Sequence, residues 1–166
     1  MADKREHHYL DRMRHHSRRY REFHRPSVEL VVNLFYTYDV IYTRLARAVE
    51  RERLSNTSFN VLMVLSRCGE GGCPMHELGE LLFVSRANIT GLVGCLEQRG
   101  LVERVPSAED RRVRLVRLTE AGAGLLEEIL PRHYGEVRAT LRGLSVREKS
   151  DLSRLLTKLR HVVQGS

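Results

Sequence analysis

The sequence predicts a mainly α-helical protein that carries one small β-hairpin wing. Three observations lead to this fold class. Apolar residues recur at three- and four-residue spacings through most of the 166 residues, which is typical of amphipathic helices. Residues that favour helix N-caps, such as Ser85 and Thr119, precede several of these stretches. Residues 101–105 and 113–118 instead alternate apolar and charged side chains, and this alternation predicts two strands.

The N-terminal part of the chain divides into a polar arm and an apolar helix. Residues 1–25 are rich in arginine and histidine, and their few apolar side chains give only a faint helical stripe. Pro26 and Ser27 then open a helical stretch that we expect to reach about Arg53. Its apolar face is so wide that it needs cover from more than one side, from its own chain or from a partner subunit.

The middle of the chain predicts three helices in quick succession. Residues 55–57 (SNT) supply N-cap chemistry for a helix that ends near residue 67. A glycine-rich loop separates it from a short helix over residues 75–82. After a three-residue turn, Ser85 caps a further helix over residues 86–99. One side of that helix is an apolar stripe, and the opposite side is small and uncharged (Ala87, Gly91, Gly94 and Gln98).

The C-terminal part returns to helices after the hairpin. Gly100 ends the preceding helix as a C-terminal cap, and residues 106–112 form the hydrophilic tip between the strands. Thr119 caps a long helix to about Leu141, in which Pro131 predicts a kink or a local break. A last helix follows residues 144–145, and its leucines and valines share one face (Leu152, Leu155, Leu156, Leu159 and Val163).

The net charge of +7 is concentrated in two short segments. Residues 1–25 hold eight basic and four acidic residues, and residues 99–117 hold six and three, so the rest of the chain is balanced. A surplus placed in this way indicates a polyanionic partner, with double-stranded DNA first. The alternative is a solvated tail combined with chance clustering.

Helix, short turn, helix and basic hairpin is the order of a winged helix-turn-helix. The major groove of DNA admits one α-helix, whose N-terminal side chains meet the base edges. We therefore expect the helix over residues 86–99 to bind DNA, since its apolar stripe anchors one side and its small side lets the backbone approach. Close packing of Gly91 and Gly94 against another helix is the alternative. The expected DNA-binding residues of this region are Ser85, Arg86, Ala87, Asn88 and Thr90.

The arginines of the hairpin suit a different part of DNA. A narrow minor groove concentrates negative potential and attracts a projecting arginine. We expect Arg111, Arg112 and Arg114 to bind DNA, with Asp110 orienting the guanidinium of Arg112. An exposed ion pair with no role in DNA binding is the alternative.

The sequence gives little support for a membrane protein, a secreted protein or an enzyme. The apolar runs stop well short of the ~20 residues that a membrane span needs, and the N-terminus has no signal peptide pattern. We therefore expect a cytoplasmic protein that does not bind membranes. No nucleophile elbow, zinc-protease, P-loop or dinucleotide motif is present, so we expect no enzyme, no cofactor and no metal. The three cysteines are expected to be ordinary thiols.

Four segments together carry a resemblance to a known family. They are residues 78–93 (LGELLFVSRANITGLV), residues 96–102 (LEQRGLV), residues 110–112 (DRR) and residues 118–122 (LTEAG). With this spacing the chain resembles the MarR family of bacterial regulators over about residues 28–163.

The resemblance implies a six-helix dimeric architecture with winged helix-turn-helix lobes. It implies dimerisation through residues 26–54 and 119–166, a DNA-binding lobe over residues 55–118, and a sequence-specific regulator of transcription in the bacterial nucleoid. Many members are repressors that small phenolic or anionic ligands release from a palindromic operator. The resemblance also implies that Arg112 matches the wing arginine that an aspartate, here Asp110, orients.

Two features separate this sequence from subgroups of the family. Trp is absent, and residues 26–53 contain no cysteine, so the urate-responsive and peroxide-sensing subgroups do not fit. Weak candidates for an effector site are Tyr38, Met63 and His133. Two alternatives stay open: a redox-responsive regulator through Cys95, and a nonspecific or architectural nucleic-acid-binding protein.

Overall fold

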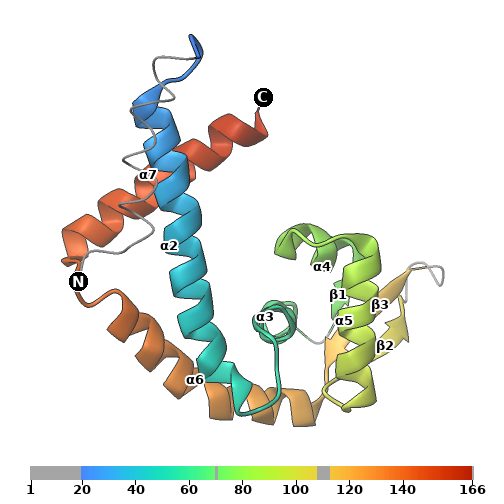
Figure 1. Ribbon diagram of the computed structural model, residues 1–166. Coiled ribbons are helices and arrows are strands. Elements are labelled where there is room, and N and C mark those ends of the chain that lie inside the picture. Colours follow the sequence, from blue (N-terminus) through green and yellow to red (C-terminus); the bar gives the residue numbers. More distant parts are fainter. Residues whose placement is uncertain (1–19, 70, 108–112, 166) are drawn as a thin grey trace. The chain divides into compact units, whose positions relative to one another are not determined.

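The computed structural model describes residues 20–69, 71–107 and 113–165 of the chain (Figure 1). The elements, in order, are α2 (Arg25–Glu50), α3 (Asn56–Leu65), β1 (Cys73–Pro74), α4 (Met75–Leu82), α5 (Arg86–Gln98), β2 (Val102–Pro106), β3 (Arg114–Leu118), α6 (Glu120–Thr140) and α7 (Val146–Gln164). The predicted fold class, mainly α-helical with a winged helix-turn-helix, is confirmed. No helix among the described residues has the length and apolarity that crossing a membrane requires.

The winged lobe consists of three helices and a three-stranded antiparallel sheet. Strand β3 lies in the middle, between β1 and β2. The hairpin pairs Val102 with Leu118 at its base and Pro106 with Arg114 near its tip. The third strand, β1, pairs Cys73 with Val116. Sequence analysis missed β1 and assigned its residues to a loop, because two residues are too few to show an alternating pattern.

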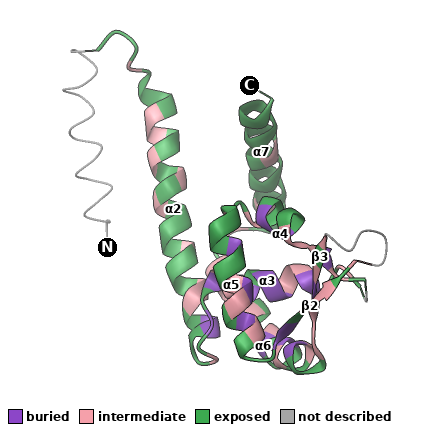
Figure 2. Cartoon of the chain, turned by 90° about the vertical axis from the view of Figure 1, so that its right-hand side faces the viewer, coloured by how far each residue is buried: buried purple, intermediate pink, exposed green. Residues whose placement is uncertain are grey.

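One hydrophobic core holds this lobe together. It is formed by buried side chains of α3, α4, α5, the sheet and the first half of α6, together with the end of α2 (Figure 2). The largest buried side chains include Phe59, Leu62, Leu78, Ile89 and Ile129. The predicted inward stripe of α5 is therefore confirmed, since Ile89, Val93 and Leu96 are all buried.

The chain divides into two compact units, residues 1–43 and 44–166, and helix α2 runs through the division. In the first unit, the described part of α2 exposes large apolar side chains, among them Phe35 at 70% and Tyr38 at 61%. In the second unit, α7 has no buried residue (Figure 2). Its apolar face is exposed from Leu152 to Val163.

Helix ends follow the sequence signals closely. Ser55, Ser85 and Thr119 each accept a hydrogen bond at a helix N-terminus, as predicted. Ser145 does the same at the start of α7. At the other end of α5, Gly100 adopts a φ of +68°, the left-handed region that glycine enters without a steric penalty. Of the kink or local break predicted at Pro131, the break is wrong, because α6 continues through that residue to Thr140; the kink stays a prediction.

Gly122 lets the start of α6 lie directly against the residues that follow α5. A Cβ atom at this position would lie 2.0 Å from the carbonyl oxygen of Leu101. Thr119, three residues earlier, donates through Oγ1 to the carbonyl oxygen of Gly100 at 2.7 Å and accepts from the amide of Gly122 at 3.0 Å. The Leu-Thr-x-x-Gly motif is thus explained by a close backbone approach.

Replacing Gly122 with alanine is expected to lower the free energy of unfolding by about 1–3 kcal/mol, the usual cost of overpacking. The clash is with backbone, so it is not relieved by a change of rotamer. The matched control is Gly124→Ala in the same helix, where a Cβ atom would meet nothing within 4 Å. That control is expected to stabilise slightly through helix propensity. Urea unfolding followed by circular dichroism compares the two, and equal stability of the two variants would contradict the packing argument.

Candidate nucleic-acid interface

Helix α5 presents a buried face to the core and an exposed face to solvent. The N-cap Ser85 accepts a hydrogen bond from the amide of Asn88 at 3.3 Å. This cap fixes the direction in which the chain enters α5 after the turn. Phe83 in that turn has a left-handed φ of 53° and is 80% exposed. The first turn of α5 therefore projects from the lobe with its side chains accessible.

All five residues that we predicted for DNA contact in this region are exposed. They lie at the N-terminal end of α5, the end that meets base edges in a major groove. The hydroxyl of Thr90 donates to the carbonyl oxygen of Arg86 at 2.8 Å, so in the free protein its proton is already engaged. The structure brings these residues together at one end of one helix: Ser85, Arg86, Ala87, Asn88 and Thr90. Their role in DNA binding stays a prediction.

The two glycines of α5 have different surroundings. A Cβ atom at Gly91 would meet nothing within 4 Å, and one at Gly94 would lie 3.7 Å from Nη2 of Arg104. Neither position packs against another helix closely enough to require glycine. Gly91 has no side chain and is exposed, so another molecule could approach the backbone of α5 closely at this position.

Several arginines of the basic segment 99–117 are engaged within the protein. The Nη1 atom of Arg104 pairs with Glu97 at 3.2 Å, and its Nη2 atom donates to the carbonyl oxygen of Thr90 at 3.2 Å. Arg104 thereby ties strand β2 to α5. Arg117 pairs with Glu103 at 2.9 Å across the hairpin. The charge cluster thus has a partly structural explanation that composition alone did not reveal.

The remaining residues predicted to act in DNA binding lie at or near the tip of the hairpin. Arg114 begins β3 and is exposed. Asp110, Arg111 and Arg112 lie outside the described residues. Their proposed contact with a minor groove stays a prediction.

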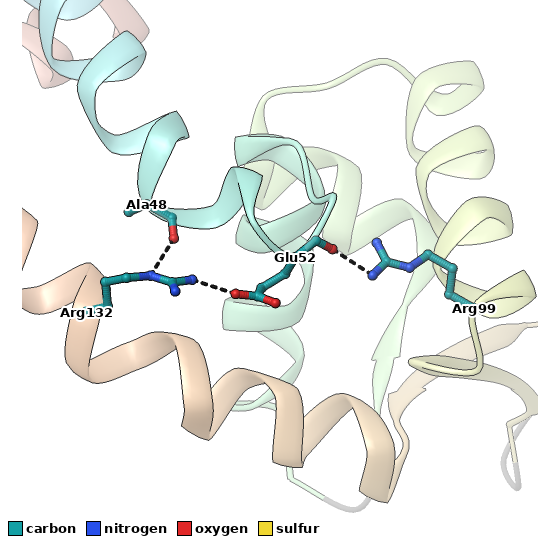
Figure 3. Close-up of polar contacts among 4 residues, drawn as sticks. All are labelled: Ala48, Glu52, Arg99 and Arg132. Carbon is teal, nitrogen blue, oxygen red and sulfur yellow. Dashed lines mark hydrogen bonds and ion pairs between the residues drawn. The ribbon is translucent and has the colours of Figure 1, made fainter.

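A polar junction at the end of α2, which Figure 3 shows, was not predicted from the sequence. Arg132 of α6 donates through Nε to the carbonyl oxygen of Ala48 at 2.9 Å and through Nη2 to the Glu52 carboxylate at 2.7 Å. Arg99, at the C-terminal end of α5, donates to the carbonyl oxygens of Glu52 at 2.8 Å and Arg53 at 3.0 Å. The partners are 46 to 84 residues apart in sequence, so no local pattern could have indicated them.

The three weak candidates for an effector site lie in different surroundings. Tyr38 belongs to the first unit, where its ring lies 5.5 Å from that of Tyr42. Met63 is half-buried against the core. The ring of His133 lies 4.6 Å from that of Phe59, and its Nδ1 atom is buried without a hydrogen-bond partner among the described residues. A role in ligand binding stays a prediction for all three.

The position of His133 predicts a dependence of stability on pH. Burial lowers the pKa of His133 below its ordinary value of 6.5. The unfolded chain therefore binds this proton more readily, and the free energy of unfolding falls as the pH drops below about 6.5. His133→Phe is expected to flatten that fall between about pH 7 and pH 5, as measured by urea unfolding at each pH. The control is His76→Phe at an exposed site on α4, which is expected to keep the wild-type profile; an unchanged slope in His133→Phe would refute the argument.

The cysteines are free thiols in different environments. Burial raises the pKa of the Cys73 thiol to about 12, and a hydrogen bond with Cys68 and the nearby Glu77 carboxylate act in the same direction. A thiol of this kind is protonated and unreactive at neutral pH. Cys95 is exposed on α5. Within the described ranges, no three histidine, cysteine or acidic side chains come together as metal ligands.

Comparison with known proteins agrees with this geometry. A family model described as MarR family matches residues 54–113. The HTH-type transcriptional regulator MhqR of Bacillus subtilis (strain 168) is 31% identical over 133 residues, which cover 80% of this chain and 90% of that protein. A solved structure of a probable transcriptional regulator from Pseudomonas aeruginosa is 30% identical, with a TM-score of 0.72, and the match covers 81% of this chain and 99% of that one.

A second similar solved structure is that of BpsR from Bordetella bronchiseptica, a protein whose DNA binding is regulated by 6-hydroxynicotinic acid. It is 25% identical, has a TM-score of 0.74, and the match covers 83% of this chain and 96% of that one. The winged helix, the exposed end of α5 and these relatives lead to one conclusion. The chain is a DNA-binding transcriptional regulator and belongs to the MarR family.

Proposed function

We propose that the chain acts as a homodimer that binds a palindromic operator and represses transcription until a small aromatic or anionic effector releases it. The observation that carries the proposal is the exposed N-terminal end of α5, where the side chains of Arg86 and Asn88 are accessible. Arginine bonds guanine bidentately and asparagine bonds adenine, so this end suits base-specific contact. The proposal assigns the chain no catalysed reaction and places it in the bacterial cytoplasm.

The exposed apolar faces of α2 and α7 support a dimer. Helix α7 leaves Leu152, Leu155 and Val163 exposed at 45%, 53% and 68%. A contiguous apolar surface of this kind is expected to be covered by another copy of the chain. Two copies related by a two-fold axis would present two α5 helices to half-sites about 10 base pairs apart.

An effector is proposed from the relatives rather than from a formed site. The regulation of BpsR by 6-hydroxynicotinic acid is the precedent for an aromatic anion acting on DNA binding. His133 is our first candidate contact, since its Nδ1 atom is buried without a described partner.

Selection from a random pool of DNA duplexes tests the proposal. The full chain is expected to enrich a palindrome whose half-sites are centred about one helical turn apart, ~10 base pairs. Sedimentation of the complex is expected to give two chains per duplex. Recovery of a pool with no shared sequence would overturn the proposal in favour of a nonspecific or architectural nucleic-acid-binding protein.

A redox-responsive regulator is a second candidate, and the exposure of Cys95 favours it. Cys95 follows Gly91 by four residues and Asn88 by seven, so the three share one exposed face of α5. Oxidation of this thiol would place polar bulk on the face proposed to meet DNA.

Treatment with peroxide is then expected to weaken operator binding about tenfold or more in a gel shift, and reduction is expected to restore it. Cys95→Ser should abolish the response, while Cys68→Ser serves as the matched control and should keep it. Operator affinity that peroxide leaves unchanged would remove this candidate.

A further inference from the structure

The loop that joins α2 to α3 is a meeting point of three helices. Figure 3 shows Glu52 between two arginines, with its carboxylate bonded to Arg132 and its carbonyl oxygen bonded to Arg99. Arg132 comes from α6, and Arg99 comes from the end of α5. One residue therefore links the helix proposed to read DNA with a helix proposed to form the dimer.

The hydrogen bonds of Arg132 at this junction are partly shielded from solvent and join two neighbouring segments of the chain. The Arg132 and Glu52 side chains are 35% and 21% exposed, so solvent screens their ion pair only partly. Arg132 also donates to the carbonyl oxygen of Ala48, so it holds both the last turn of α2 and the loop. A planar guanidinium can bind two acceptors in this way, whereas an ammonium group cannot match the geometry.

The C-terminal end of α5 is fastened at a second point. The hydroxyl of Thr119 donates to the carbonyl oxygen of Gly100, and the amide of Thr119 donates to that of Leu101. Gly122 packs against the same Leu101 carbonyl group. The C-terminal end of α5 is thus held by α6 and by the loop after α2, while Ile89, Val93 and Leu96 pack the helix along its length into the core of the lobe.

Because α5 is packed along its length into the lobe, the helix and the lobe turn together, and a turn about the junction moves the exposed end of α5. The 13 residues of α5 span roughly 20 Å at about 1.5 Å per residue. A turn of the lobe by about 10° about the junction would move the exposed end of α5 by roughly 3.4 Å, which is the rise of one base pair. Small changes at the junction would therefore change which separation of half-sites a dimer fits.

We propose that Arg99, Glu52 and Arg132 are positioning residues that set the half-site spacing at which the dimer binds DNA. The inference rests on the proposed function, since it requires a dimer on a palindromic site. None of the three residues has to touch DNA for this role. Their effect is on the angle at which α5 is presented.

The experiment measures the affinity for a series of duplexes that carry the selected half-sites at different separations. The test variants are Arg99→Met and Arg132→Met, which keep much of the apolar stem and remove the junction bonds. The matched control is Arg44→Met, since Arg44 on α2 forms an exposed ion pair with Glu136 on α6 at 3.4 Å without reaching α5. All three variants lose one positive charge, so a general loss of attraction to phosphate is common to them.

The wild-type chain and Arg44→Met are expected to lose about tenfold or more in affinity when one base pair is inserted or removed between the half-sites. Arg99→Met and Arg132→Met are expected to lose no more than about threefold for the same change. An affinity that falls equally at every spacing would overturn the inference, because it would mean that the junction only stabilises the lobe. A spacing profile identical to that of the wild type would overturn it as well.

The design separates failure of this inference from failure of the proposed function. If the wild-type chain selects no palindrome, the proposed function fails and the inference fails with it. If the wild type has a spacing preference and the Arg99 and Arg132 variants keep it, only the inference fails. Circular dichroism and sedimentation confirm that each variant is folded and dimeric; Arg99 is exposed, so its variant decides the question even if Arg132→Met does not fold.

Discussion

Replacing Arg86 and Asn88 together with alanine is expected to weaken binding to the selected operator about thirtyfold or more while the fold stays intact. Each bidentate contact with a base contributes about 1–3 kcal/mol of discrimination, so the loss of two is large. Both side chains are exposed in the first turn of α5, and alanine has a higher helix propensity than either residue. The loss should therefore come from DNA contact, with the free energy of unfolding little changed.

The matched control for this variant is the pair Arg138→Ala and Asn60→Ala. These residues are exposed on α6 and α3 of the same unit, and their replacement removes the same two side-chain types. Fluorescence anisotropy with operator and with scrambled duplex compares the two double variants. If the Arg86 and Asn88 variant weakened both duplexes equally, the contacts would be with phosphate alone. If it weakened neither, α5 would not read DNA.

Placing two carboxylates on the apolar face of α7 is expected to dissociate the dimer and to remove operator binding almost completely. Leu155 and Leu159 are 53% and 38% exposed and lie one helical turn apart. Burying an unpaired carboxylate in an interface is costly, so the variant Leu155→Glu with Leu159→Glu should be monomeric at micromolar concentration. A monomer loses the gain in effective concentration that links two half-sites, which is about 10²–10⁴ in affinity.

The control places the same charge on the opposite face of α7. Ser153 and Gln164 are exposed, and replacing both with glutamate adds two carboxylates without touching the leucines. Analytical ultracentrifugation is expected to give a monomer for the leucine variant and a dimer for the control. A dimeric leucine variant that still binds the operator would show that α7 is not at the subunit interface.

Elements with a strong local signal were predictable from the sequence. The spacing of Ile89, Val93 and Leu96 identified α5 and its buried face, and Ser85 and Gly100 marked its ends. The same kind of signal located the hairpin. These features depend on neighbours within a few residues, which is the range over which side-chain periodicity and capping act.

Features that depend on distant partners were not predictable. Arg99, Arg104 and Arg117 all belong to the basic segment 99–117, which we interpreted as a surface for DNA. In the structure each is bound within the protein, to loop carbonyl groups, to Glu97 or to Glu103. Net charge is a sum over a segment, and it does not distinguish a guanidinium that binds DNA from one that joins two helices.

An equilibrium competition measures whether α5 makes this chain a sequence-specific DNA-binding protein. The selected palindrome is labelled, and either the same unlabelled palindrome or a scrambled duplex of equal composition competes for the wild-type chain at about 150 mM salt, near physiological ionic strength. The scrambled duplex is expected to compete about a thousandfold or more weakly, the range typical of specific binding. Equal competition by the two duplexes would contradict this expectation.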